Sequence, residues 1–271
     1  MSKFRAGGEA AEQAAADQAA GFARTEFFKL DAKGKDAPSE CIVRFITTLD
    51  PSETSCGVIT VDEHSFVQTK GRYAGYPEGS KWPEKMGAVC RKTKLGDGSR
   101  YSDECFICDH MRKSDGKAYN PSAKTWALAC IREEVIEDGR IVGYRDKTRE
   151  VTRKGKDGAA DEKVVEKDIV IVRMAMKNFW TPLLGMARRY GSLTDRDWFI
   201  KRTGSEMNDT TYTIAPIDPL HMEDGSVYDT ARPEILALYP TDVDIEEEVE
   251  NLIGEDYYAK FFDTRVAYVA K

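Results

Sequence analysis

The sequence predicts a mainly β protein with some α-helix and a separate inserted segment. Short runs rich in β-branched and aromatic residues alternate with turns that contain Gly, Pro or Asp over most of the 271 residues. One run continues into an amphipathic helix, and an acidic helical stretch lies near the C-terminus. The glycine-rich stretch 71–98 lacks the apolar periodicity of a core element, so we expect another interaction to hold it.

The expected strands follow in order along the chain. Two lie in EFFKLDAKGKDAPSECIVRFI, around a turn, and the next lies in CGVITVDEHSFVQ. TWALACIREEVIEDGRIVGYRD has the pattern of a hairpin with a Glu-Asp-Gly turn. IVIVRMAMKNFWTPLLGMARRYGS starts as a strand and becomes a helix, and DWFIKRTG and TTYTIAPID give two more strands. Such strands favour an OB-like five-stranded barrel with peripheral helices.

The chain divides into three parts. Residues 1–24 are rich in alanine and are expected to form a mobile helical arm. Residues 25–217 would form the barrel core, with an insertion at about 62–115 and a charged loop at about 147–167. Residues 218–271 form an acidic C-terminal segment, which ends in DYYAKFFDTRVAYVAK, aromatic and apolar enough to pack against the body.

Charge is distributed unevenly between these parts. The net charge is −7, but residues 218–256 contain 13 acidic residues and one basic residue, so the rest of the chain carries +5. No window approaches the roughly 18 apolar residues that a membrane span needs, and the N-terminus lacks the apolar region of a signal peptide. We therefore expect a mildly basic body that stays in the cytosol.

The segment DECFICDHMRKSD contains a pattern typical of metal sites. Cys105 and Cys108 have the Cys-x-x-Cys spacing that lets one turn present two thiolates to one ion. Six cysteines are too few for a disulfide scaffold, and Cys90 lies 15 residues upstream as a third ligand. The candidates for the fourth ligand are His64, His110 and Cys56.

We favour His64 because it would fix both ends of the insertion at one point. His110 lies in the turn that leaves the Cys-x-x-Cys pair, where one backbone rarely presents three ligands to a single ion. Cys41 and Cys130 lie in apolar runs and are expected to be buried. The prediction is one structural Zn²⁺ in a zinc-ribbon-like subdomain.

Aromatic and basic residues are interleaved around these cysteines. Bases of single strands stack on aromatic rings for about 1–3 kcal/mol each, while Lys and Arg follow the phosphates. Trp180 and Trp198 are expected inside the core instead. The candidate contacts are Arg72, Tyr73, Tyr76, Lys81, Trp82, Arg91, Lys92, Lys94, Arg100, Tyr101, Arg112, Lys113, Lys201 and Arg202.

The order of EFFKLDAKGKDAPSECIVRFI, His64, Cys90, YSDECFICDHMRKSDGKAYN and KTWALACI resembles the helix-destabilising single-stranded DNA-binding proteins of large tailed phages. The resemblance covers roughly residues 25–145 by motif. It implies an OB fold with an inserted zinc-ribbon subdomain whose ligands are one histidine and three cysteines. The matching residues are His64, Cys90, Cys105 and Cys108.

The resemblance also implies roles for other residues. Tyr101 and Tyr119 occupy the positions of DNA-facing tyrosines. The arm with Lys3 and Arg5 resembles a basic arm that mediates self-association along the strand. The acidic C-terminus resembles a segment that recruits replication or recombination proteins and competes with DNA.

The expected function is sequence-independent coating and protection of single-stranded DNA in phage replication, recombination or repair, without enzymatic activity. If the protein is phage-encoded, it acts in the cytoplasm of the bacterial host. Two alternatives remain open: a zinc-dependent nuclease, and a zinc-ribbon adaptor that binds only protein. Against the nuclease, the sequence has no H-E-x-x-H motif and only three histidines.

Overall fold

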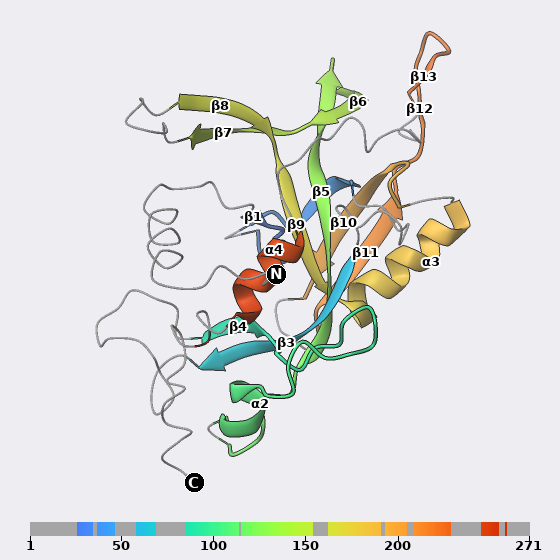
Figure 1. Cartoon of the computed structure of the whole chain (residues 1–271). Helices are drawn as coiled ribbons and strands as arrows, with labels where there is room; N and C mark the ends of the chain where they lie inside the picture. Colours follow the sequence, from blue (N-terminus) through green and yellow to red (C-terminus); the bar gives the residue numbers. More distant parts are fainter. Residues whose placement is uncertain are drawn as a thin grey trace.

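The structure, a computed structural model, shows a large open sheet with a metal-site candidate at one end (Figure 1). It describes residues 26–34, 37–46, 58–68, 85–113, 115–153, 162–190, 193–204, 209–228, 245–254 and 258.

Nine strands form the main sheet. The middle of β5 is buried over six consecutive residues, so both faces of the sheet are covered there. β1 pairs with β9 in parallel, and the other pairs are antiparallel. The strands are β1 (Glu26–Phe27), β2 (Glu40–Phe45), β3 (Ile59–Gln68), β4 (Lys85–Val89), β5 (Ser122–Glu137), β6 (Arg140–Asp146), β9 (Ile169–Ala175), β10 (Asp197–Thr203) and β11 (Thr211–Pro216).

β5 is the centre of this sheet because its 16 residues reach four other strands. Along one edge it pairs with β3 and then β2, and along the other with β9 and then β6. β6 continues from β5 through the predicted hairpin turn, where Asp138 and Gly139 both have positive φ. A turn with two left-handed residues matches the twist of the strands, which explains the Asp-Gly pair.

The protein is mainly β, as predicted. Within the described residues, however, its main sheet does not close into the expected five-stranded barrel. Closure requires the two end strands to pair. Here β1 and β11 are the ends of the strand order, and each pairs with one neighbour only. β1 has just two residues, which is too short to seal a barrel.

The largest core cluster lies between the sheet and the helical segment that follows β9. This segment begins with a π-helical turn, Met176–Trp180, and continues as α3, Thr181–Tyr190. Trp180 and Trp198 are fully buried, as predicted, and each indole N–H donates to a backbone carbonyl at 2.9 Å. Their polar atoms are therefore satisfied inside the core.

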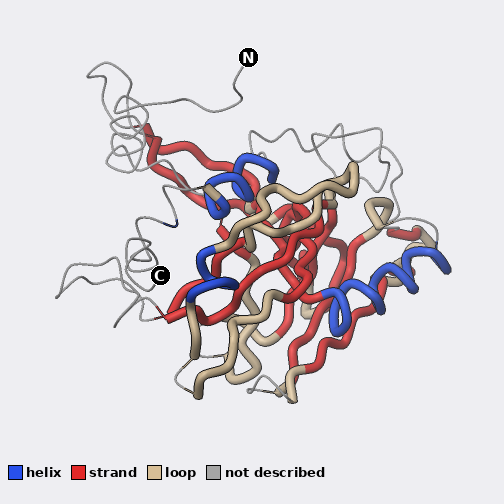
Figure 2. The backbone as a smooth tube through the Cα atoms, turned by 60° about the horizontal axis from the view of Figure 1, so that its bottom comes forward, coloured by secondary structure: helices blue, strands red, loops and turns tan. Residues whose placement is uncertain are grey.

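One expectation about local structure was wrong. The charged stretch 147–167 was expected as a loop, but β7 (Thr148–Arg153) and β8 (Glu162–Lys167) pair there as a ribbon. Figures 1 and 2 place this ribbon and α3 at opposite ends of the molecule. Around the Cys-x-x-Cys pair, the described residues form one short helix, α2, Phe106–His110, which contains Cys108.

The described part of the acidic C-terminal segment is ordered against the sheet. Residues 220–228 form a small hairpin of β12 (Leu220–His221) and β13 (Val227–Tyr228). α4, Ile245–Ile253, is the predicted acidic helix, and its apolar side chains at every fourth position are buried. None of the helices in the described ranges is long and apolar enough to cross a membrane.

Candidate metal centre

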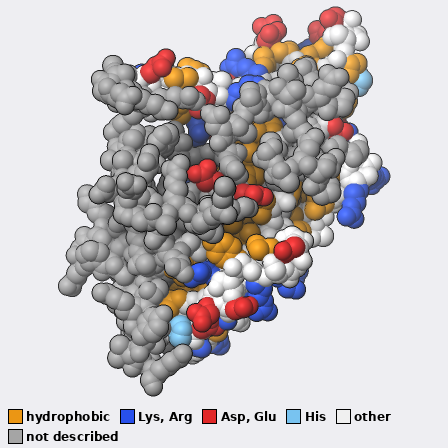
Figure 3. Space-filling model, viewed as in Figure 1, with side chains coloured by type: hydrophobic (Ala, Val, Ile, Leu, Met, Phe, Trp, Pro, Cys, Tyr) orange, Lys and Arg blue, Asp and Glu red, His pale blue; other side chains and the backbone are white. Residues whose placement is uncertain are grey.

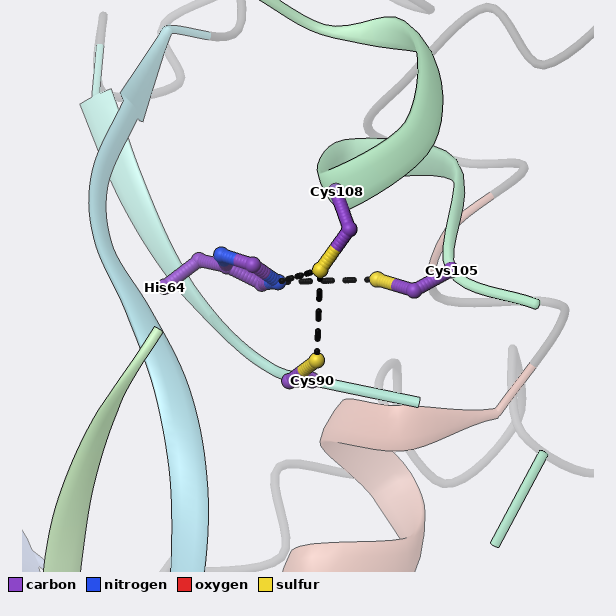
Figure 4. Close-up of side chains that lie close together, drawn as sticks. All are labelled: His64, Cys90, Cys105 and Cys108. Carbon is purple, nitrogen blue, oxygen red and sulfur yellow. Dashed lines mark hydrogen bonds between the residues drawn. The ribbon is translucent and has the colours of Figure 1, made fainter. Parts of the chain in front are cut away.

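Four side chains from three separate parts of the chain meet at one point (Figure 4). His64 projects from β3, and Cys90 follows directly after β4, the strand paired with β3. Cys105 precedes the first residue of α2, and Cys108 lies inside this helix. His64, Cys90 and Cys105 are buried, and Cys108 is half-buried.

The spacing of the donor atoms fits a tetrahedral zinc ion. With Zn–S of about 2.3 Å and Zn–N of about 2.0–2.1 Å, a tetrahedron separates its sulfur atoms by about 3.8 Å and nitrogen from sulfur by about 3.6 Å. The Nε2 atom of His64 lies 3.5 Å from the Sγ atoms of both Cys105 and Cys108. The Sγ atoms of Cys90 and Cys108 are 3.6 Å apart, and all four donors lie within 4.8 Å of one another.

The tautomer of His64 is fixed by its second nitrogen. Its Nδ1 atom is 2.6 Å from the backbone oxygen of Tyr119. Because a carbonyl can only accept, Nδ1 carries the proton, and the Nε2 lone pair faces the three sulfur atoms. A backbone carbonyl on the far nitrogen is the usual way in which proteins orient a metal-binding histidine.

Backbone turns hold the three cysteines in place. The N–H group of Cys90 donates to the oxygen of Asp62 on β3 at 2.7 Å, and the oxygen of Cys90 accepts from Thr93 at 2.9 Å. On the other side, the N–H group of Cys105 donates to the Asp109 carboxylate at 3.1 Å. Asp109 also pairs with Lys92 at 2.6 Å, so this ion pair links the Cys90 turn to α2.

The glycine-rich loop between Cys90 and Cys105 folds back on itself. Leu95 N–H donates to Ser99 O at 2.8 Å, and Tyr101 N–H donates to Thr93 O at 3.0 Å. Gly98, at φ 84°, supplies the left-handed residue at the tip. The loop therefore needs no core of its own, since backbone bonds and the cluster hold its base.

The three thiols have strongly different acidities in this arrangement. A hydrogen bond from Cys90 lowers the pKa of Cys105 to about 2, and donating that bond raises the pKa of Cys90. Burial raises the pKa of Cys108 to about 11. Ionisation of one thiol thus opposes ionisation of its neighbours; a bound dication would let all three ionise and act as ligands.

The donor set is therefore the one predicted from the sequence. His110 is exposed and stacks against Phe106 instead of joining the cluster, which rules it out as the fourth donor in this arrangement. Cys56 lies outside the described residues. Cys41 and Cys130 lie in the sheet away from the cluster, where burial raises the pKa of each to about 12. Cys130 is buried, as expected, whereas Cys41 is only half-buried.

Seven of the residues expected in nucleic-acid binding or self-association lie outside the described part of the chain. They are Lys3, Arg5, Arg72, Tyr73, Tyr76, Lys81 and Trp82.

The remaining basic candidates differ in how free their charges are. Lys94 and Arg100 face each other across the loop as an isolated bridge and are both exposed. Arg91 and Lys92 are half-buried at its base. Lys113 is exposed beside the Tyr119 ring, with Nζ 5.7 Å from the ring centre.

Lys92 pairs with Asp109, as described above, and three other basic candidates also have protein partners. The Arg112 guanidinium donates to the backbone oxygens of Cys108, Asp109 and Met111, at the C-terminal end of α2. Lys201 on β10 pairs with Glu40 on β2 at 2.7 Å. Arg202 donates to the oxygen of Leu30 at 2.7 Å. These contacts give each side chain a structural role.

The two tyrosines implied by the resemblance are not equally accessible. Tyr101 is half-buried and packs against the cluster that contains α4. Tyr119 is 6% exposed, so its ring has little surface for a base, and its described contribution to the site is the carbonyl that orients His64.

Sequence reasoning missed several residues that support the centre. The hydrogen bond between Asp109 and Cys105 could not be predicted because only the folded turn brings the two residues together. The guanidinium of Arg173 on β9 lies over both the Phe27 and the Trp126 ring, at 5.2 and 5.3 Å from their centroids, and pairs with buried Glu63, the neighbour of His64. Tyr258 reaches the cluster from the C-terminal segment, and the only signal was the aromatic sequence after α4.

Comparison with known proteins gives no family for this chain: no family model matches it, and no curated protein and no solved structure matches it.

Proposed function

We propose that this protein binds single-stranded DNA without sequence preference, as the helix-destabilising proteins of large tailed phages do, and that its zinc is structural. In this proposal the metal centre holds the loop 91–113 as one wall of a basic groove. The expected OB-type relationship belongs to the same proposal.

The observation that carries the proposal is the closed, buried donor set of one histidine and three cysteines. Four protein donors complete a tetrahedral shell, so zinc held by them has no position left for water or substrate. Such a centre suits a structural role far better than a hydrolytic one. It therefore favours a binding protein over the nuclease alternative.

The surface beside the centre supports this proposal through its exposed cations. Lys94 and Arg100 are exposed, and neither forms an ion pair with another described residue. Lys113 adds a third exposed charge next to α2. Figure 3 also shows acidic side chains among the basic ones at the lower edge of the view, around α2. The excess of positive charge there is modest, so we expect few phosphate contacts and binding that weakens only moderately as the salt concentration rises.

The proposal extends to two kinds of protein partner. Self-association along the strand would use the N-terminal arm with Lys3 and Arg5, and replication or recombination proteins would bind the acidic C-terminal segment. Both ideas rest on the distribution of charge in the sequence. An adaptor that binds only protein is the competing interpretation of the same zinc-ribbon-like centre.

The test is a salt titration of binding to poly(dT) and to duplex DNA by the zinc-loaded and chelated protein. We expect preferential binding to poly(dT), lost after chelation. Replacing both Lys94 and Arg100 with Ala should lower the slope of log K against log salt for poly(dT) by about 1.4, since each phosphate contact on a single strand contributes about 0.7.

A matched control removes a cation elsewhere. Lys163 on β8 is 70% exposed and lies on the ribbon, so Lys163→Ala should leave the salt slope unchanged. No binding to poly(dT) at low salt would favour the adaptor. Cleavage of the strand by the zinc-loaded protein would favour the nuclease.

A further inference from the structure

Tyr258 connects the C-terminal segment to the metal centre. It lies more than 150 residues after Cys105 in the sequence, yet its side chain is 2% exposed and packs in the same cluster as Cys90, Cys105 and Ile107. A tyrosine buried to this extent requires a partner for its hydroxyl group.

The hydroxyl group contacts both halves of the centre. It donates to the backbone oxygen of Val89 at 2.6 Å, and Val89 immediately precedes the ligand Cys90. Its oxygen also lies 3.6 Å from the Sγ atom of Cys105. The Tyr258 side chain therefore contacts both the residue that precedes Cys90 and the sulfur atom of Cys105.

Backbone bonds join Tyr258 to α4. The N–H group of Tyr258 donates to Gly254 O at 3.2 Å, and the N–H group of Gly254 donates to Glu250 O at 3.0 Å. Both bonds span four residues, as in a helix, so the position of Tyr258 depends on the position of α4.

The apolar face of α4 packs on the strands that form the base of the centre. Ile245, Val249 and Ile253 share a buried cluster with Val61 of β3 and Val89 of β4. α4 is also a carrier of acidic residues, with Glu246, Glu247 and Glu248 in its first turn. Whatever fixes α4 on β3 and β4 thus also fixes the position of these acidic residues.

We propose that Tyr258 is an outer-sphere positioning residue of the metal centre, and that through it metal binding and docking of the segment from α4 to Tyr258 stabilise each other. The inference requires metal binding by the four-residue cluster but does not require single-stranded DNA binding.

The physical reason is that docking and metal binding demand the same arrangement of Val89, Cys90 and Cys105. With metal bound, the strand end and the sulfur are held where the Tyr258 hydroxyl group meets both. With the segment docked, two of the donors are held for the metal. Such a coupling free energy is reciprocal: undocking must weaken metal binding by the factor by which metal loss weakens docking.

The experiment measures zinc affinity, by competition with a chromophoric chelator, and amide hydrogen exchange of 245–253 in the full-length protein. Tyr258→Phe keeps the ring but removes the hydroxyl group. We expect zinc affinity to fall by roughly 10- to 100-fold, the range for outer-sphere partners, and exchange of α4 to rise in the zinc-loaded variant. Chelation of the unaltered protein should raise exchange in α4 as well.

The matched control is Tyr228→Phe. The Tyr228 hydroxyl group also donates to a backbone oxygen, that of Tyr144, at 2.7 Å, but on the β6 side of the sheet. This variant should keep both zinc affinity and α4 exchange at the level of the unaltered protein.

A second variant tests the coupling from the other end. Val249→Asp places a charge in the buried face of α4 and should undock the helix without touching a metal donor; it should still lower zinc affinity, whereas Glu250→Ala on the exposed face should not. Unchanged zinc affinity in both Tyr258→Phe and Val249→Asp overturns the coupling while leaving DNA binding intact as a proposal. An unaltered protein that takes up no zinc overturns the metal premise itself.

Discussion

His64 does its work through both ring nitrogens. Nδ1 donates to Tyr119 O, and this bond leaves Nε2 directed at three sulfur atoms. His110 lies closer to the cysteines in the sequence but is exposed on the far end of α2. Burial and the hydrogen bond at the second nitrogen, and not proximity in the sequence, thus distinguish the donor from its alternative.

These two histidines allow a matched test of the centre. His64→Ala removes one donor of a tetrahedral site and leaves the three thiols without their neutral partner, so zinc affinity should fall by at least roughly 100-fold, beyond the effect of losing an outer-sphere group. His110→Ala should retain about one zinc per chain. Metal analysis after gel filtration measures both, and zinc retained by His64→Ala but lost by His110→Ala would reverse our assignment of the donor.

At the scale of elements, β2 and β10 are joined by two ion pairs, one buried and one exposed. Asp197 lies opposite Arg44, and Lys201 lies opposite Glu40. Arg44 and Asp197 are buried and pair at 2.5 Å, whereas Lys201 and Glu40 are 44% and 48% exposed. Asp197 also accepts from Arg132 of β5 at 3.2 Å, so one carboxylate holds two arginines in the sheet.

Removing the buried charge should therefore cost far more than removing the exposed one. Asp197→Asn leaves Arg44 without its compensating charge and should lower the free energy of unfolding by about 3–5 kcal/mol. Glu40→Gln removes the exposed partner on the same pair of strands and should cost less than about 1 kcal/mol. Urea denaturation of the three proteins gives both differences. Equal losses would contradict the role assigned to burial.

The elements themselves could be predicted unevenly from the sequence. β2, β5 and β10 have apolar or alternating patterns that depend on local composition, and the structure confirms them. β7 and β8 have few apolar residues, and each is a strand because it pairs with the other, through contacts such as that of Lys163 with Glu150 at 2.6 Å. Composition alone indicated a loop there because no single segment contains that information.

At the scale of the whole molecule, the buried residues divide into separate clusters. The largest, between the sheet and α3, contains no donor of the metal centre. A smaller one contains Cys90 and Cys105 together with Tyr119 and Tyr258. The cysteine pattern predicted the donors of this small cluster, but Tyr258 could not be predicted because its place depends on how α4 docks.

This division predicts how the protein responds to loss of zinc. Binding of structural zinc supplies roughly 10–16 kcal/mol in small zinc-finger peptides, and here that energy would be concentrated in the small cluster. Chelation should raise amide exchange in β3, β4 and residues 90–119, while β9 and β10, which belong to the large core, stay protected. Hydrogen exchange with and without chelator, followed by zinc addition, measures this. Equal loss of protection in β9 and β10 would mean that the centre and the sheet unfold as one unit. No change in exchange anywhere would mean that zinc does not stabilise β3, β4 and residues 90–119.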